Sequence, residues 1–170
     1  MLNALRRSKE RQLTASRLNQ ALVTRAREPV FFLRLGVQDT LDGRFDLVVV
    51  HAWLVLDRLA AAGETALSQA FVDTIFITFD EALRELGAGD IGIGKRVKKL
   101  AKAFYGRMQA YGDAKDAAAM EAALIRNLYR GANEPGAKAL ARYMLAAKAR
   151  LAASDLETGN LDFGPLPEEE

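Results

Sequence analysis

The feature that most constrains this chain is an apolar run, residues 47–56, interrupted only by His51. In a helix, such a run is hydrophobic on every side, which is typical of a helix buried inside a bundle. The apolar pattern continues to residue 62 and meets no helix breaker before Gly63. A segment of about 20 residues is common for a helix and long for a strand, so we predict a buried central helix. Charges close to both ends of the run argue against a membrane span, which needs ~20 apolar residues.

The composition favours one domain made of helices. The chain has 170 residues, of which 50% are hydrophobic, so it can bury a sizeable core. Alanine is abundant and the four prolines fall mostly near the expected helix ends. We predict an all-α, single-domain bundle of about six or seven helices over residues 14–154. Residues 1–13 are expected to form a flexible or helical extension. Residues 155–170 are expected to be an acidic, flexible, proline-containing tail, from which Leu161 and Phe163 dock weakly on the domain.

Start signals and periodicity place the individual helices. Thr14 and Asp42 are expected N-caps, because their side chains can accept a hydrogen bond from a first-turn amide. Pro29 suits the first turn of a short segment, since its ring fixes a helical φ. Besides the central helix, the periodicity predicts helices over residues 14–27, 65–86, 93–112, a stretch that opens at 116, and 136–153.

The composition also bears on function. The chain has no cysteine, so it has no disulfide, thiolate nucleophile or thiolate metal site, and with one histidine we expect no metal and no cofactor. A net charge of +2 is not typical of a DNA-binding protein. The first 20 residues contain no apolar signal-peptide core. We therefore expect a cytoplasmic protein, with a peripheral position at the inner face of the inner membrane as the alternative.

A glycine-rich stretch matches the spacing of a phosphate-binding loop. Residues 89–95 read G-x4-G-K, but Arg96 stands where the loop needs Ser or Thr to hold magnesium. The stretch also follows a predicted helix, whereas the loop must follow a strand. A connection between two helices is therefore the favoured interpretation.

Two short groups of polar residues could carry a site. His51 could act as a general base with Asp39 or Asp46, yet Asp46 lies five residues earlier and off the histidine face of the helix. No nucleophile pattern such as G-x-S-x-G accompanies it. A buried, hydrogen-bonded structural histidine is the favoured interpretation, and contact with a partner the alternative. Trp53 is expected in the core or an interface. Asp39 and Arg44 are expected to pair and fix the loop, with partner contact as the alternative.

Two predicted helices carry surfaces that packing of the core does not by itself explain: one is apolar and the other is basic. On the predicted 65–86 helix, the apolar stripe that includes Phe76 suits either the core or a groove for a partner. Between residues 95 and 107, basic side chains gather mostly on one side of a helix, where they could bind RNA, anionic lipid or an acidic protein, or simply face water. Only Tyr105 interleaves with them as an exposed aromatic, which weakens the RNA interpretation. The basic residues are Lys95, Arg96, Lys98, Lys99, Lys102 and Arg107.

Three stretches together resemble the ubiquinol–cytochrome c chaperone family. Residues 37–59 resemble its signature, residues 89–111 its second block and residues 120–131 its third, and the resemblance covers roughly residues 10–150. The size of the chain looks like the bacterial branch. The resemblance implies an all-α assembly factor for the cytochrome bc complex, without a catalytic residue. Mitochondrial relatives act with a small partner, bind near the ribosomal tunnel exit and hold newly made cytochrome b.

We therefore predict a non-enzymatic assembly chaperone. It would bind newly made cytochrome b or a related apolar helical subunit during biogenesis of the ubiquinol–cytochrome c reductase complex. A groove beside the 65–86 helix would take the client, and the basic 95–107 face would meet a ribosome or an anionic membrane surface. The alternatives are an RNA or anionic-lipid adaptor that uses the basic helix, and a small helical enzyme centred on His51. The candidate partner-binding residues are Asp39, Arg44, His51, Trp53, Phe76, Lys95, Lys98, Lys99, Lys102, Tyr105 and Arg107.

Overall fold

The fold is all-α, as predicted. We describe a computed structural model over residues 2–85, 90–132 and 134–167. Within those ranges the regular secondary structure consists of seven helices, and the only strand-like feature is an isolated bridge between Asp155 and Asn160. The helices are α1 (Leu2–Ala26), α2 (Pro29–Leu33), α3 (Leu41–Ala61), α4 (Thr65–Glu85), α5 (Asp90–Asp113), α6 (Ala117–Asn127) and α7 (Gly136–Leu151).

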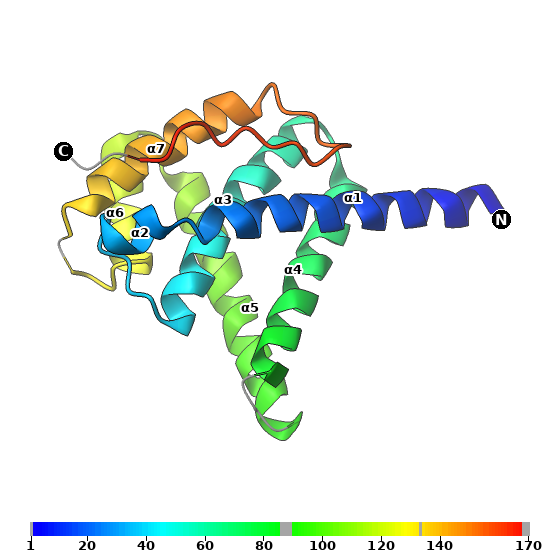
Figure 1. Ribbon diagram of the computed structural model, residues 1–170, viewed down its shortest axis with the longest axis horizontal. Helices are drawn as coiled ribbons and strands as arrows, with labels where there is room; N and C mark the ends of the chain where they lie inside the picture. The colour runs from blue at the N-terminus through cyan, green and yellow to red at the C-terminus, as the bar shows by residue number, and fades with distance from the viewer. Residues whose placement is uncertain (1, 86–89, 133, 168–170) are drawn as a thin grey trace.

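The predicted central helix, α3, lies in the middle of the bundle. It contacts α1, α4, α5 and α7, while α6 packs mainly on α7 (Figure 1). Every side chain from residue 49 to residue 55 is buried, so the helix is enclosed on all sides, as its continuous apolar run requires. The α4–α5 hairpin extends downward from this body in Figure 1, and the N-terminal half of α1 extends sideways past the other helices.

The helix starts differ in part from those predicted. Thr40, not Asp42, caps α3: its hydroxyl accepts a hydrogen bond from the Gly43 amide at 3.1 Å. A side chain at Gly43 would collide with the Gln38 carbonyl, which explains the glycine there. Asp42 instead lies in the first turn, where its charge favours the helix dipole. Thr14 caps nothing, because α1 begins at Leu2 and runs through it.

Other starts follow the prediction. Pro29 occupies the first turn of α2. Asp116 caps α6, with its carboxylate 2.8 Å from the Ala119 amide. The helix α5 begins at Asp90, about a turn earlier than predicted. Most of the stretch that matches a phosphate loop is therefore the first turns of a helix, and its first residue, Gly89, lies outside the described residues.

The segment after α7 forms no helix and runs along α1 and α7 (Figure 1). The expected docking of Leu161 and Phe163 is confirmed: Phe163 is buried and Leu161 packs against the core. One guanidinium nitrogen of Arg25 donates to the backbone carbonyls of Gly164 at 2.8 Å and Pro165 at 2.9 Å. These contacts attach the described part of the tail to the bundle.

The helices also bear on membrane association. Over residues 2–85, 90–132 and 134–167, none of them combines the length and the apolar character needed to cross a bilayer.

Candidate functional site

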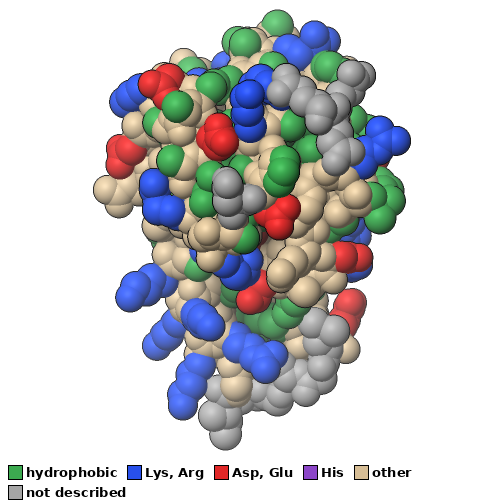
Figure 2. All heavy atoms as spheres, turned by 90° about the vertical axis from the view of Figure 1, so that its left-hand side faces the viewer, with side chains coloured by type: hydrophobic (Ala, Val, Ile, Leu, Met, Phe, Trp, Pro, Cys, Tyr) green, Lys and Arg blue, Asp and Glu red, His purple; other side chains and the backbone are tan. Residues whose placement is uncertain are grey.

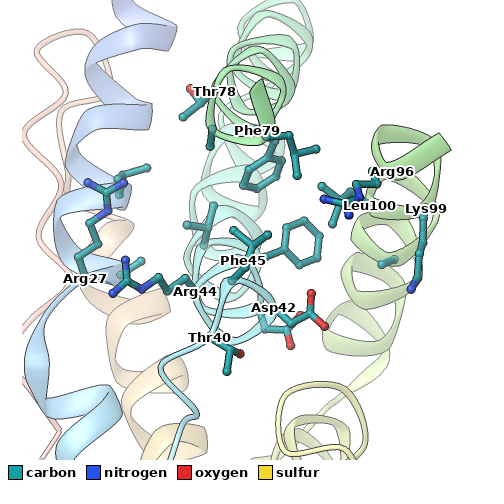
Figure 3. Close-up of a pocket in the computed structure, with 18 of the residues that line it drawn as sticks. Arg27, Thr40, Asp42, Arg44, Phe45, Thr78, Phe79, Arg96, Lys99 and Leu100 are labelled. Atoms are coloured by element: carbon teal, nitrogen blue, oxygen red, sulfur yellow. The ribbon is translucent and has the colours of Figure 1, made fainter. Parts of the chain in front are cut away.

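A cleft of about 740 Å³ opens between the first turns of α3, the second half of α4 and the first half of α5 (Figure 3). The C-terminal end of α1 closes one side of it. The lining residues are Val23, Ala26, Arg27, Asp39, Thr40, Leu41, Asp42, Arg44, Phe45, Asp46, Val48, Thr78, Phe79, Ala82, Leu83, Glu85, Arg96, Lys99, Leu100, Ala103, Arg107 and Arg130. The α4–α5 hairpin thus forms one wall and the capped start of α3 forms the opposite wall.

The floor of the cleft is apolar and aromatic. Phe45 of α3 and Phe79 of α4 lie beside each other, with ring centroids 5.0 Å apart (Figure 3). Phe79 also contacts Phe76 edge-on at 6.0 Å, so the floor continues into an aromatic cluster between α4 and α5. Leu83 and Leu100 complete the apolar lining from the two arms of the hairpin.

A buried acidic residue with two arginine partners lies at the base of the cleft. Asp46 is fully buried, and its two carboxylate oxygens lie 2.8 Å from Arg107 and 3.1 Å from Arg130. The guanidinium of Arg107 also lies over the Phe45 ring, 5.7 Å from its centroid. Burial raises the pKa of Asp46 to about 6, because the loss of hydration outweighs the attraction of both arginines.

Charged side chains surround the mouth of the cleft. Asp39 and Arg44 form an exposed ion pair with 2.6 Å between Oδ1 and Nε, which confirms the predicted loop pair. The hydrogen bond from Arg44 lowers the pKa of Asp39. Figure 3 shows Arg27 and Arg44 at one side of the cleft and Arg96 and Lys99 on α5 at the other. The rim therefore offers cations on both sides of an apolar floor.

His51 lies in the sealed core and does not line the cleft. Its Nδ1 lies 2.8 Å from the Leu47 carbonyl oxygen, which can only accept, so Nδ1 carries the proton. Its Nε2, 2.9 Å from the Tyr143 hydroxyl, then accepts. The rings of Phe31 and Phe163 cover it edge-on. Burial lowers its pKa to about 4, so the ring is neutral at pH 7. The structural interpretation of this histidine is supported.

Two other aromatic candidates lie outside the cleft. Trp53 is buried, with the Tyr111 ring edge-on and the Lys148 ammonium 5.2 Å from its centroid. Phe76 is half-buried and contacts Phe79, as described above, and Tyr105 of α5. Both belong to the packing of the bundle rather than to the cleft lining.

The basic residues of α5 divide into two groups. Lys95, Lys98, Lys99 and Lys102 are exposed, as expected for a solvent face. Arg107 is not part of that face: 16% of its side chain is exposed, and it donates to the Asn127 carbonyl as well as pairing with Asp46.

The structure therefore brings together only some of the predicted site residues. Asp39, Arg44, Lys99 and Arg107 line the cleft, whereas the other candidates do not. Asp46 was not predicted as a site residue, although a signal existed. It shares a helix face with residues 49, 50 and 53, all apolar, so an unpaired carboxylate there would be costly. The arginines that pair with it come from distant parts of the chain.

Comparisons with known proteins place this fold. The family model described as ubiquinol–cytochrome c chaperone matches residues 33–158. The crystal structure of the Cbp3 homolog from Brucella abortus superposes with a TM-score of 0.82 at 38% sequence identity, over 97% of each chain. A search of curated proteins gave no match. The matched region includes α3, α4, α5 and the lining residues that they contribute. The chain belongs to the ubiquinol–cytochrome c chaperone family.

Proposed function

We propose that this protein holds newly made cytochrome b, or a related apolar helical subunit, in the cleft during biogenesis of ubiquinol–cytochrome c reductase. The observation that carries the proposal is the cleft itself: an apolar floor between α3, α4 and α5, with charges only at its base and rim. The cleft lies beside α4, where the sequence leads us to expect a groove for a client. Membership of the ubiquinol–cytochrome c chaperone family indicates the complex that the client belongs to.

The size of the cleft suits one helical segment. An α-helix with side chains is about 10 Å across and rises 5.4 Å per turn, so about 740 Å³ has room for roughly two turns. An amphipathic or apolar helix binds a groove of this kind through side chains on one face. The rings of Phe45 and Phe79 would contact that face, while Arg27, Arg44 and Lys99 remain in water at the rim. The client is thereby shielded from aggregation without any covalent step.

The contacts of His51 argue against the enzyme alternative. A general base needs a nitrogen within reach of a substrate proton. Both ring nitrogens of His51 are engaged inside the fold, by the Leu47 carbonyl and the Tyr143 hydroxyl, and the ring is 0% exposed. A substrate in the cleft would therefore not reach the histidine.

Filling the cleft tests the proposal directly. Ala82 and Ala103 line it from the two arms of the hairpin and are half-buried, so Ala82→Trp or Ala103→Trp would occupy the space a client needs. Ala146→Trp, on the exposed side of α7, is the matched control. Tagged protein would be recovered from detergent-solubilised membranes of the native host, and the bound subunits identified by mass spectrometry.

We expect cytochrome b with the natural protein and with the Ala146→Trp control, and a loss of at least about tenfold with either cleft variant, since a tryptophan removes the contact area of the client. Thermal melting should show all four proteins folded. Recovery of cytochrome b at the natural level with both folded cleft variants would show that the cleft is not its binding site. Failure of the natural protein to recover any reductase subunit would contradict the client assignment.

A further inference from the structure

We propose that the outer face of α5 docks on an anionic lipid bilayer, with the cleft opening beside the membrane surface. The inference deepens the proposed function, and rests on it for what occupies the cleft. It explains why the helix that forms one wall of the cleft also carries four exposed lysines on its outer face. A client that must enter lipid would then be held at the surface into which it inserts.

The charge of this face is uniform. Residues 91–112 contain no Asp or Glu. Lys95, Lys98, Lys99 and Lys102 are all exposed, and at 3.6 residues per turn they occupy a sector of about 100° of the helix. Among the described residues, none of the four forms an ion pair with an acidic side chain. Figure 2 shows blue side chains gathered without red at the lower left, the level at which Figure 1 places the α4–α5 hairpin.

The two flanks of this lysine face differ in a way that fits a bilayer. On one flank Tyr105 is 58% exposed and stacks on Phe76, with ring centroids 6.5 Å apart. A tyrosine with an apolar ring and a polar tip suits the headgroup level of a membrane. On the other flank Arg96 and Lys99 border the cleft. With the lysines facing the headgroups, the cleft therefore opens at the height of the bilayer surface.

The side-chain types favour lipid over RNA. The four exposed cations in the sector are lysines, which act as hydrated point charges, whereas bidentate recognition of phosphates and bases favours arginine. Tyr105 is the one large exposed aromatic of α5 among the residues that the structure describes, so stacking platforms for successive bases are missing. Clusters of basic residues adsorb to anionic leaflets by summing weak attractions, which requires no defined pocket.

The test uses the purified full-length protein and lipid vesicles. Co-sedimentation would compare vesicles of phosphatidylcholine alone with vesicles that also contain phosphatidylglycerol. The variant Lys95→Glu, Lys98→Glu, Lys102→Glu reverses the face without changing a cleft-lining residue. We expect the natural protein to sediment only with the anionic vesicles, less at high salt, and the variant to lose at least about tenfold in binding.

A matched control separates this face from net charge. Arg7→Glu, Lys9→Glu, Arg11→Glu makes the same charge change on the exposed start of α1 and should keep its binding. Equal loss in both variants, binding to both kinds of vesicle, or no binding to anionic vesicles would overturn the proposal. So would a variant that keeps its vesicle binding and loses affinity for purified ribosomal RNA instead.

The two proposals can fail separately. The triple α5 variant leaves the cleft intact, so in detergent extract, where no bilayer is present, it should still recover cytochrome b. Vesicle binding that is unaffected by the α5 variant, together with loss of cytochrome b from the cleft-filling variants, would reject only the membrane inference. The reverse pattern would reject only the client assignment.

Discussion

The start and the middle of α3 each bury a titratable side chain, and they do so by opposite means. His51, in the middle of the helix, is neutral and satisfied by a carbonyl and a hydroxyl. Asp46, about one and a half turns earlier, is held by two guanidinium groups at the base of the cleft. A neutral network lets the core close around it, whereas a buried charge requires counterions that extend to water. The same helix thereby supports a sealed core and an open cleft.

The partners of these two side chains explain why only the start of α3 borders a cleft. Tyr143, which donates to His51, also accepts from Arg25, and Arg25 in turn holds the tail segment over the histidine. Every group in that chain of contacts belongs to the bundle. Around Asp46, by contrast, the Arg130 side chain is 44% exposed and lines the cleft. The ionic cluster at the start of α3 therefore borders solvent, where a ligand can contact Arg130.

The largest effect is expected from removing the charge at the cleft. Asp46→Ala leaves Arg107 largely buried without its counterion. Breaking a buried ion pair from one side typically costs about 3–5 kcal/mol, so urea unfolding should show a loss of this order.

The control for that change is Asp42→Ala. Asp42 is exposed and lies 3.6 Å from Arg130, so its loss should change the unfolding free energy little. If both variants unfold at the same urea concentration as the natural protein, the ionic cluster does not hold the cleft together. The contrast between the start and the middle of α3 then fails.

A smaller loss of unfolding free energy is expected in the sealed core around His51. His51→Ala removes a buried ring and leaves the Leu47 carbonyl and the Tyr143 hydroxyl each without one partner. A loss of about 2 kcal/mol in unfolding free energy should follow, with recovery of cytochrome b from detergent extract unchanged. Unchanged melting together with lost client recovery would show instead that His51 takes part in binding.

The contrast also shows which parts of the molecule a sequence can reveal. Burial of α3 and of His51 was predictable, because a continuous apolar run permits no exposed face. The short reach of such patterns explains the errors at helix starts: Thr40 and Asp42 both offer a capping oxygen, and the choice depends on the close approach of Gly43 to Gln38.

The residues that line the cleft could not be predicted in the same way. The partners of Asp46 lie on α5 and in the turn after α6, and nothing local in the sequence indicates that Arg107 turns inward while Lys102 faces water. The apolar excess of α4 was visible, but Phe79 and Leu83 line the cleft, whereas Phe76 packs against Phe104. Only the crossing of α4 and α5 over α3 decides which apolar residues remain accessible.

The smallest expected effect concerns pH, where the contributions of His51 and Asp46 to stability should oppose each other. The pKa of His51 falls from 6.5 to about 4 on folding, so the unfolded chain takes up this proton first. Its contribution to stability is complete above pH 6.5 and is lost as the pH falls toward 4. The pKa of Asp46 rises from 3.8 to about 6, so the folded chain holds a proton that the unfolded chain has released. Its contribution therefore grows as the pH falls from 6 toward 4.

Single variants should separate these two opposing contributions. Between pH 7 and pH 5, proton uptake by His51 in the unfolded chain should lower the unfolding free energy by about 2 kcal/mol. Proton uptake by Asp46 in the folded chain should raise it by about 1 kcal/mol. Unfolding free energies of Asp46→Asn should therefore fall more steeply on acidification than those of the natural protein, while His51→Gln should fall less or rise. Each variant is compared with itself at the two pH values, so its constant loss of packing cancels. Parallel slopes for all three proteins would mean that neither group changes its protonation equilibrium on folding, and that the start and the middle of α3 differ only in geometry.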